Sequence, residues 1–327
     1  MIDPRPVTTS ARVHRWRDEA AVTLTASDYT TTWLPDCGML GVSLTHRGDE
    51  LLALPRSIAD YRKGMPKGGY TGLPLNAPYA NRLSQRRFSL AGREVDVHRS
   101  AASDRNHLPI HGTLQAQPFT IESVESDART ARIVARHRHR EPEQLAGFPF
   151  AHDYVVTIEL SGRGLRVTTT VQSDEPGSVP VSFGWHPFLR VPATPRSQWQ
   201  LRLPGRSHVE LDDVLLPTGR HRREASETRV LGRRTFDDHY DLGRDRRFTL
   251  AGRDRRIDLR FDAGYAHAQI YLPPIDASGW LTTDFICIEP MTAPINALVD
   301  GTHLRVSDDA PYSATFTIAA RAIARSG

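Results

Sequence analysis

The chain has 327 residues, of which 39% are hydrophobic and 24% charged, ordinary proportions for a globular protein. Its 42 basic residues are almost all arginine and are interleaved with 38 acidic ones, leaving a net charge of only +4. Scattered charge of this kind does not form a basic stripe, so we expect no nucleic-acid partner. The only cysteines, Cys37 and Cys287, are too few for a disulfide framework or a thiolate zinc site, and we predict no metal site.

No segment has the composition of a targeting or membrane-spanning element. The N-terminal residues lack the apolar core of a secretory signal. No run approaches the roughly 18 apolar residues that a membrane helix requires. We therefore expect a cytoplasmic protein without membrane association. No flexible linker or shift in composition divides the chain, so residues 1–327 are interpreted as a single domain.

Alternation of apolar and polar residues at period two dominates the chain and predicts strands. A glycine-containing turn at residues 161–164 predicts a hairpin between two of these strands. Helical periodicity is almost absent, with one expected turn of helix at residues 57–61. These features predict an all-β protein, a sandwich or a barrel. In chain order, the strands are expected at residues 22–25, 132–135, 154–160, 165–171, 269–272, 285–289 and 314–318.

The tract from Arg136 to Arg140 alternates arginine with His137 and His139. Alternation makes it an exposed strand end, and we do not interpret it as a metal site. Phosphate-binding loops, dinucleotide fingerprints and nucleophile elbows are also absent from the sequence. The chemistry has to be sought in isolated polar residues.

Five segments carry polar residues in positions suited to proton transfer or to binding a sugar. Each has a plain structural interpretation, such as a turn or a surface ion pair, when taken alone. Together they supply an acid, a base, hydroxyl-binding groups and aromatic surfaces. The candidate residues are Asn81 with Arg82, His111 before a glycine, His186 before a proline, Asp237 and Glu289.

Glu289 is the hardest of these residues to explain by structure alone. Strand alternation puts it on one face with Phe285 and Cys287, and carboxylates rarely lie among apolar residues without a partner. Desolvation would raise its pKa towards that of a general base at neutral pH. His186, between aromatic residues, is expected near its ordinary pKa, with Glu289 kept ionised by a neighbouring Arg82 or protonated histidine.

In this order, the segments resemble the aldose 1-epimerase (galactose mutarotase) family, from about residue 30 to residue 318. The resemblance implies a large antiparallel β-sandwich of the supersandwich type, acting on a monosaccharide without a cofactor. The matching segments are Tyr79-Ala80-Asn81-Arg82-Leu83, Ile110-His111-Gly112-Thr113, His186-Pro187-Phe188-Leu189, Asp237-Asp238-His239-Tyr240, and Ile288-Glu289-Pro290 with Pro294-Ile295-Asn296-Ala297.

By this resemblance, Glu289 is the base that takes the proton of the sugar's C1 hydroxyl, and His186 is the acid that protonates the ring oxygen. Arg82, His111 and Asp237, with Asn81, are implied to bind the sugar. Asp238 remains an alternative to Asp237. Three positions depart from the family pattern and leave sugar specificity open: Thr113, Leu189 and Met291.

Alternatives to a mutarotase of free aldoses remain at this stage. A mutarotase for an anionic sugar would need surplus arginine at the site, for instance Arg56, Arg62 or Arg86. A carbohydrate-binding or sugar-sensing protein would need neither an acid nor a base, so the presence of both His186 and Glu289 favours catalysis. The oligomeric state is expected to be a monomer or a homodimer.

Overall fold

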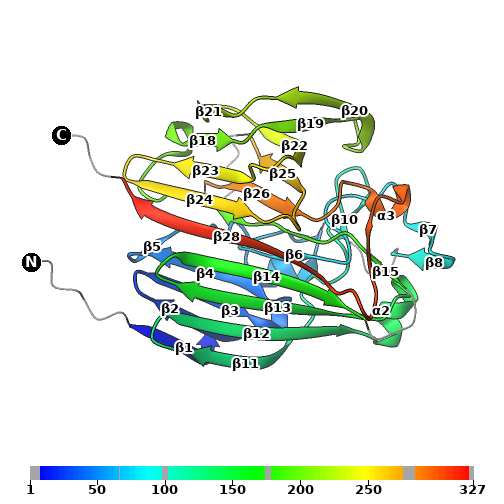
Figure 1. The fold of residues 1–327 in the computed structure, drawn as a ribbon, viewed down its shortest axis with the longest axis horizontal. Helices are drawn as coiled ribbons and strands as arrows, with labels where there is room; N and C mark the ends of the chain where they lie inside the picture. The colour runs from blue at the N-terminus through cyan, green and yellow to red at the C-terminus, as the bar shows by residue number, and fades with distance from the viewer. Residues whose placement is uncertain (1–7, 66, 98–101, 174–177, 275–283, 324–327) are drawn as a thin grey trace, which may run out of the picture.

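The fold is built almost entirely from strands, in a computed structural model that describes residues 8–65, 67–97, 102–173, 178–274 and 284–323. The all-β prediction is confirmed (Figure 1). The expected helical turn is present and begins after Ser57, whose hydroxyl accepts a hydrogen bond from the Asp60 N–H. The α-helices in the described residues are α1 (Ile58–Lys63), α2 (Pro142–Gly147) and α3 (Ala297–Asp300), with 3₁₀ turns η1 (Pro35–Cys37) and η2 (Arg196–Gln198).

Three antiparallel sheets carry most of the chain. In spatial order, the nine-stranded sheet contains β11 (Thr120–Ser126), β12 (Thr130–His139), β13 (His152–Ser161), β14 (Gly164–Gln172), β28 (Tyr312–Ala322), β24 (Arg255–Phe261), β23 (Arg247–Ala251), β18 (Gln200–Leu203) and β21 (Glu227–Val230). The five-stranded sheet contains β1 (Thr9–Trp16), β2 (Glu19–Ala26), β3 (Tyr29–Leu34), β4 (Leu40–His46) and β5 (Asp49–Glu50).

The third, eight-stranded sheet positions the candidate site. Its strands are β20 (Pro217–Glu224), β19 (Arg206–Leu211), β22 (Phe236–Leu242), β25 (His267–Leu272), β26 (Ile286–Met291), β16 (Gly184–Trp185) and β6 (Leu75–Asn76), with β17 (Phe188–Leu189) also beside β26. Two-stranded ribbons complete the described strands: β7 (Arg87–Leu90) with β8 (Arg93–Asp96), β9 (Ala102–Ser103) with β10 (Pro109–Ile110), and β15 (Val179–Val181) with β27 (Leu304–Val306).

The nine-stranded sheet is one layer, and the other two sheets lie along it. Strands β1 to β3 pack against β11 to β13 at one end, while the eight-stranded sheet lies at the other (Figure 1). Trp185 joins the layers: its ring lies 6.1 Å from Trp33 of β3 and 6.0 Å from Phe316 of β28. All three side chains belong to one buried hydrophobic cluster. Burying each large apolar side chain contributes about 1.5–3 kcal/mol, so this shared core holds the sheets together.

The arginine–histidine tract differs from its prediction. His137 and His139 are buried, with 4% and 1% of their surface exposed, whereas an exposed strand end was expected. They point inward from β12 and bond backbone carbonyls, His137 Nδ1 with Pro118 at 2.9 Å and His139 Nε2 with Phe148 at 3.0 Å. The prediction of an exposed strand end was wrong, because the segment carrying Phe148 covers the face of the strand that bears the histidines.

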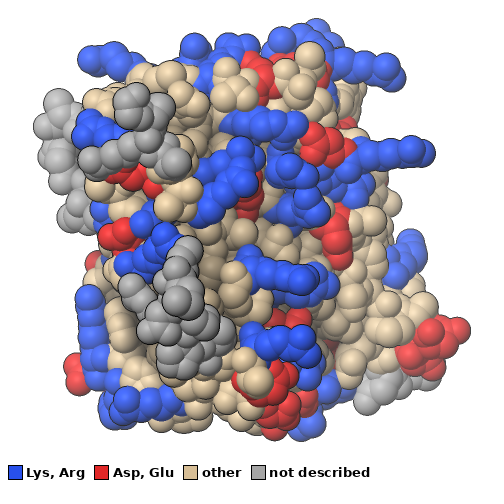
Figure 2. Space-filling view, turned by 60° about the vertical axis from the view of Figure 1, so that its left-hand side comes forward, with Lys and Arg blue, Asp and Glu red and all other residues tan. Residues whose placement is uncertain are grey.

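The surface bears mixed charge. On the face drawn in Figure 2, arginine and lysine side chains are spread among aspartate and glutamate rather than gathered in one continuous stripe. Within the described residues, no helix is both long and apolar enough to cross a membrane.

Candidate active site

Glu289 and His186 are cross-strand neighbours on one face of the eight-stranded sheet. The residue pairs on either side fix the register that puts them opposite each other: Gly184 with Met291, and Phe188 with Cys287. Pro187 has no N–H to offer the ladder, so the short strands β16 and β17 are interrupted here. His186 Nε2 lies 3.2 Å from Glu289 Oε1. The acid and base proposed from sequences about a hundred residues apart are therefore in direct contact.

Apolar and aromatic groups bury this pair. Glu289 is 2% exposed and His186 is 6% exposed. The His186 ring lies between two nearly parallel rings, Tyr70 with centroids 5.9 Å apart and Phe188 at 4.7 Å. Cys287, two residues before Glu289 on the same strand face, is also buried, as the alternation predicted.

Burial shifts both pKa values towards the uncharged forms. Desolvation lowers the pKa of His186 to about 3. Desolvation also raises the pKa of Glu289 well above its ordinary range, an effect that the Asp237 carboxylate increases and Arg82 opposes. The expectation of an unperturbed His186 beside a firmly ionised Glu289 was wrong, because both groups are removed from water. These directions leave one proton on the pair around neutral pH, favouring its residence on Glu289 in the absence of substrate.

His111 packs edge-on against His186, with ring centroids 5.1 Å apart. Its Nδ1 lies 2.9 Å from Asn76 Nδ2 and 3.3 Å from the Asn81 N–H, which donates to it. A nitrogen that accepts from a backbone N–H carries no proton, so the proton of this neutral ring belongs on Nε2. Burial keeps the pKa of His111 well below its usual value. His111 is thereby prepared to donate a hydrogen bond from Nε2.

Two non-glycine residues at the site have left-handed backbone conformations. Asn81 and His111 both have φ near 60°, which is uncommon outside glycine, and the His111 N–H donates to the Asn81 carbonyl at 2.9 Å. A Cβ added to Gly112 would lie 2.1 Å from the Ala77 carbonyl oxygen, so the missing side chain makes room for a neighbouring segment of the protein.

Arg82 is held in place by acceptors on both sides. Its Nε donates to Asp104 Oδ2 at 2.7 Å, and its Nη1 donates to Asn81 Oδ1 at 3.1 Å. Its Nη2 lies 3.7 Å from Asp237 Oδ2. Arg82 as a whole residue is 7% exposed, so the charge of its guanidinium acts in a poorly hydrated environment. The side-chain oxygen of Asn81 is therefore occupied by its hydrogen bond from Arg82.

Asp237 and Asp238 point to opposite faces of β22. Asp237 accepts a hydrogen bond from Gln269 Nε2 at 2.8 Å on the face that carries Glu289. Asp238 lies 3.3 Å from His208 Nε2 on the other face. The Asp237 side chain is 31% exposed, compared with 2% for Glu289, so the cluster becomes more accessible towards Asp237.

The structure adds residues that the sequence did not single out. They support the polar cluster or border its exposed edge: Tyr70, Asn76, Asp104, Arg105, Gln269 and Tyr271. A detectable signal existed only for Gln269, a polar residue inside an expected strand and directly opposite Glu289. The others lie on loops or depend on contacts between distant segments.

The arginines considered for an anionic sugar have other contacts. Arg62 pairs with Glu19 at 2.6 Å, and Arg86 donates to the Ser103 hydroxyl at 2.6 Å. Arg56 has its side chain against the backbone of Gly69. Besides Arg82, the exposed Arg105 also influences this cluster. Its positive charge lowers the pKa of Asp237, more weakly than that of Arg82.

Met291 and Leu189, two of the departures from the family pattern, lie on opposite faces of the sheet. Met291 packs on the Glu289 side with Ala80 and Ile295. Leu189 is fully buried in the main core. Of these two residues, Met291 is the one placed to shape the surroundings of Glu289.

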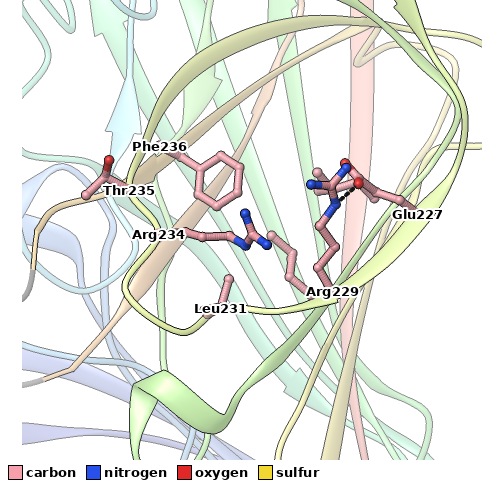
Figure 3. Close-up of a pocket in the computed structure, with 8 residues that line it drawn as sticks. Glu227, Arg229, Leu231, Arg234, Thr235 and Phe236 are labelled. Atoms are coloured by element: carbon pink, nitrogen blue, oxygen red, sulfur yellow. Dashed lines mark hydrogen bonds and ion pairs between the residues drawn. The ribbon is translucent and has the colours of Figure 1, made fainter.

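A separate cavity lies between β18, β21 and the start of β22 (Figure 3). Leu231 and Phe236 form part of its apolar wall, and Arg234 extends alongside the Phe236 ring. Arg229 is occupied by an ion pair with Glu227, drawn as a dashed line. None of the candidate site residues lines this cavity.

Solved structures share this fold across nearly the full length of the chain. A galactose mutarotase-like protein from Clostridium acetobutylicum superimposes with a TM-score of 0.83 at 18% identity, covering 97% of this chain and 99% of its own. Galactose 1-epimerase from Lactobacillus acidophilus NCFM gives 0.74 at 14% identity, with coverages of 97% and 99%. An aldose epimerase homologue from C. elegans gives 0.72 at 14% identity, covering 97% and 100%. The architecture is the galactose mutarotase-like supersandwich predicted from the sequence.

The sequence itself identifies the family. Residues 21–315 match the family model of aldose 1-epimerase, and the chain belongs to that family. No curated protein matches the chain.

Proposed function

We propose that this protein is an aldose 1-epimerase that interconverts the α and β anomers of a free aldose by acid–base ring opening. The observation that supports this most directly is the buried cross-strand contact between His186 and Glu289. The pair shares one proton, and Arg82, His111 and Asp237, which are suited to binding hydroxyls, lie in the same cluster. Mutarotation proceeds slowly in water, so one positioned acid and one positioned base supply the kind of acceleration required.

The proton is conserved through the proposed cycle. As the sugar binds, the one proton of the pair moves from Glu289 to His186, which leaves Glu289 ionised and His186 protonated. Glu289 takes the C1 hydroxyl proton, the bond between C1 and the ring oxygen breaks, and His186 protonates that oxygen. The resulting aldehyde rotates about the bond from C1 to C2. Closure on the other face reverses both transfers, so no proton is gained or lost.

The remaining polar groups are assigned to binding and charge stabilisation. His111 donates from Nε2 to a sugar oxygen, and Arg82 stabilises negative charge developing on the reacting oxygens. Asp237 accepts from a hydroxyl at the more exposed end of the cluster. Asn81 orients Arg82 through the hydrogen bond to its Nη1.

The test is polarimetry of freshly dissolved α-D-glucose and α-D-galactose, with and without the protein. The wild-type protein is expected to accelerate the approach to anomeric equilibrium. Glu289→Gln should lose most of this acceleration, by about 10²–10⁴-fold, because the amide accepts no proton. Asp238→Asn, altered on the opposite face of β22, is the matched control and should keep the wild-type rate.

A Glu289→Gln variant that is folded by circular dichroism and as active as wild type would contradict the role of Glu289. Inactivity of the wild-type protein on both sugars would contradict the free-hexose substrates. Calorimetry with a panel of neutral and anionic sugars would then separate a mutarotase for a modified sugar from a carbohydrate-binding protein.

A further inference from the structure

A second polar cluster lies on the same sheet face as Glu289, carried by strands β22 and β25. Strands β19 and β20 continue the sheet beyond β22 to its edge (Figure 1). His239 and Asp241 are two residues apart on β22, so their side chains point the same way. His267 of β25 is directly opposite Asp241 in the register. Two adjacent strands thereby bring two imidazoles and a carboxylate together.

His239 has no evident structural role. It is fully buried, and neither ring nitrogen makes a hydrogen bond of normal geometry within the described part of the chain. Gln269, its cross-strand neighbour, donates its Nε2 to Asp237, and its side-chain interaction with the ring opposes the lowering of the His239 pKa by burial. One amide can serve only one of the two ring nitrogens, so the other remains without a partner. A buried polar atom without a partner is destabilising by about 1–3 kcal/mol, so an unpaired nitrogen of His239 is open to a ligand.

The other members of the cluster are oriented around the same space. Asp241 Oδ1 lies 2.8 Å from His267 Nδ1, and Asp241 Oδ2 lies 3.0 Å from His221 Nδ1. The His239 and His267 rings are nearly parallel, with centroids 5.7 Å apart. One ligand atom from each of His239, Asp241 and His267 lies within 4.8 Å of the others.

We propose that His239, Asp241 and His267 bind a zinc ion, with His221 or a water molecule completing the coordination. Neutral imidazole and carboxylate are ordinary zinc ligands at about 2.0–2.2 Å, and a tetrahedral site brings such atoms about 3.3 Å apart. The ligand atoms, now within 4.8 Å of one another, would reach that spacing by rotation of the side chains. Magnesium and calcium prefer oxygen ligands, so a set dominated by nitrogen selects against them.

The zinc site is distinct from the acid–base pair. Gln269 separates Glu289 from His239 along the register, so neither the metal nor its ligands touch the reacting atoms. The metal would tie β22 to β25, the strands that carry Asp237 and Gln269. This inference does not rest on the proposed epimerase activity.

The experiment uses the full-length, untagged protein freed of metal with a chelator and titrated with Co²⁺. One equivalent should produce the intense visible absorption of a tetrahedral cobalt site, and one equivalent of Zn²⁺ should abolish it. Zn²⁺ should also raise the melting temperature of the chelated protein, because it binds the folded state. Mg²⁺ at the same concentration should do neither.

His239→Gln and His267→Gln should each weaken Co²⁺ binding by at least about tenfold. His208→Gln is the matched control, because His208 lies on β19 but contacts Asp238 on the opposite face. Its binding should equal that of wild type. His267 is only partly buried, so its variant remains informative if His239→Gln fails to fold.

Absence of a tetrahedral cobalt spectrum in the wild-type protein would overturn the proposal. So would equal affinity in wild type and His267→Gln, which would assign binding to other histidines among the 14 in the chain.

Discussion

His186 and His239 lie in one row of the sheet, with Glu289 and Gln269 between them. Both are buried and both face the same side, yet their neighbours differ. His186 faces a carboxylate at 3.2 Å, whereas His239 faces an amide that is occupied by Asp237. A buried imidazole beside a carboxylate shares a proton, and one without a partner offers a lone pair. The neighbouring residue, rather than burial or strand position, decides which chemistry the histidine can perform.

The largest effects are expected from changing both members of the His186–Glu289 pair. His186→Gln and Glu289→Gln should each lower the catalysed rate by about 10²–10⁴-fold, and the double variant should be hardly slower than either. Non-additivity follows because each group needs the other to complete the proton cycle. Polarimetry of the wild type, the two single variants and the double variant completes this double-mutant comparison. Multiplicative losses in the double variant would show that the two residues act independently.

The two aspartates of β22 provide a smaller and more local comparison. Asp237→Asn should lower kcat/KM by about 10–100-fold, because it removes a charged acceptor in a partly buried site. Asp238→Asn should have no effect, since its side chain lies on the opposite face against His208. Steady-state kinetics of both variants resolve the choice that the sequence left open. An equal loss in both would point to a general effect on β22 instead of a contact with the sugar.

The sequence predicted the fold and the acid–base residues because period-two alternation and short segments with unusual polar residues are local signals. It predicted that Glu289 shares a strand face with Cys287, which the structure confirms. It did not predict that Pro187 would interrupt the ladder where His186 meets Glu289. That contact depends on a register between strands far apart in the chain.

The protonation state of His186 and the cluster of His239, Asp241 and His267 could not be predicted from the sequence, for related reasons. The pKa of His186 depends on the Tyr70 and Phe188 rings that enclose it, and Tyr70 comes from a distant loop. His267 is 26 residues from Asp241, a separation that resembles no local metal-binding motif. Likewise, the burial of His137 and His139 depends on a loop that covers β12.

His139 is a third kind of buried histidine, and the pH dependence of protein stability allows it to be compared with His186 and His239. His139 Nε2 bonds the backbone carbonyl of Phe148, its one hydrogen-bond partner in the part of the chain that the structure describes, and desolvation lowers its pKa to about 4. Above about pH 6.5 the ring is neutral in both folded and unfolded chains. Between that pH and the folded pKa, the unfolded chain binds the proton and the folded chain does not. The free energy of unfolding therefore falls on acidification, by up to about 1.4 kcal/mol per pH unit for this residue.

His139→Gln keeps a donor for the Phe148 carbonyl but removes the titration. The variant should be less stable than wild type at about pH 7.5, because glutamine fits the histidine site imperfectly, and the difference should shrink by about 1 kcal/mol as the pH falls to about 5.5. Urea unfolding of both proteins at several pH values measures this change. Parallel stability curves would mean that His139 takes up its proton equally well in the folded and unfolded chains. Burial beside a carbonyl would then not suffice to keep an imidazole neutral. The different chemistry of His186 and His239 would then depend on their neighbouring side chains alone.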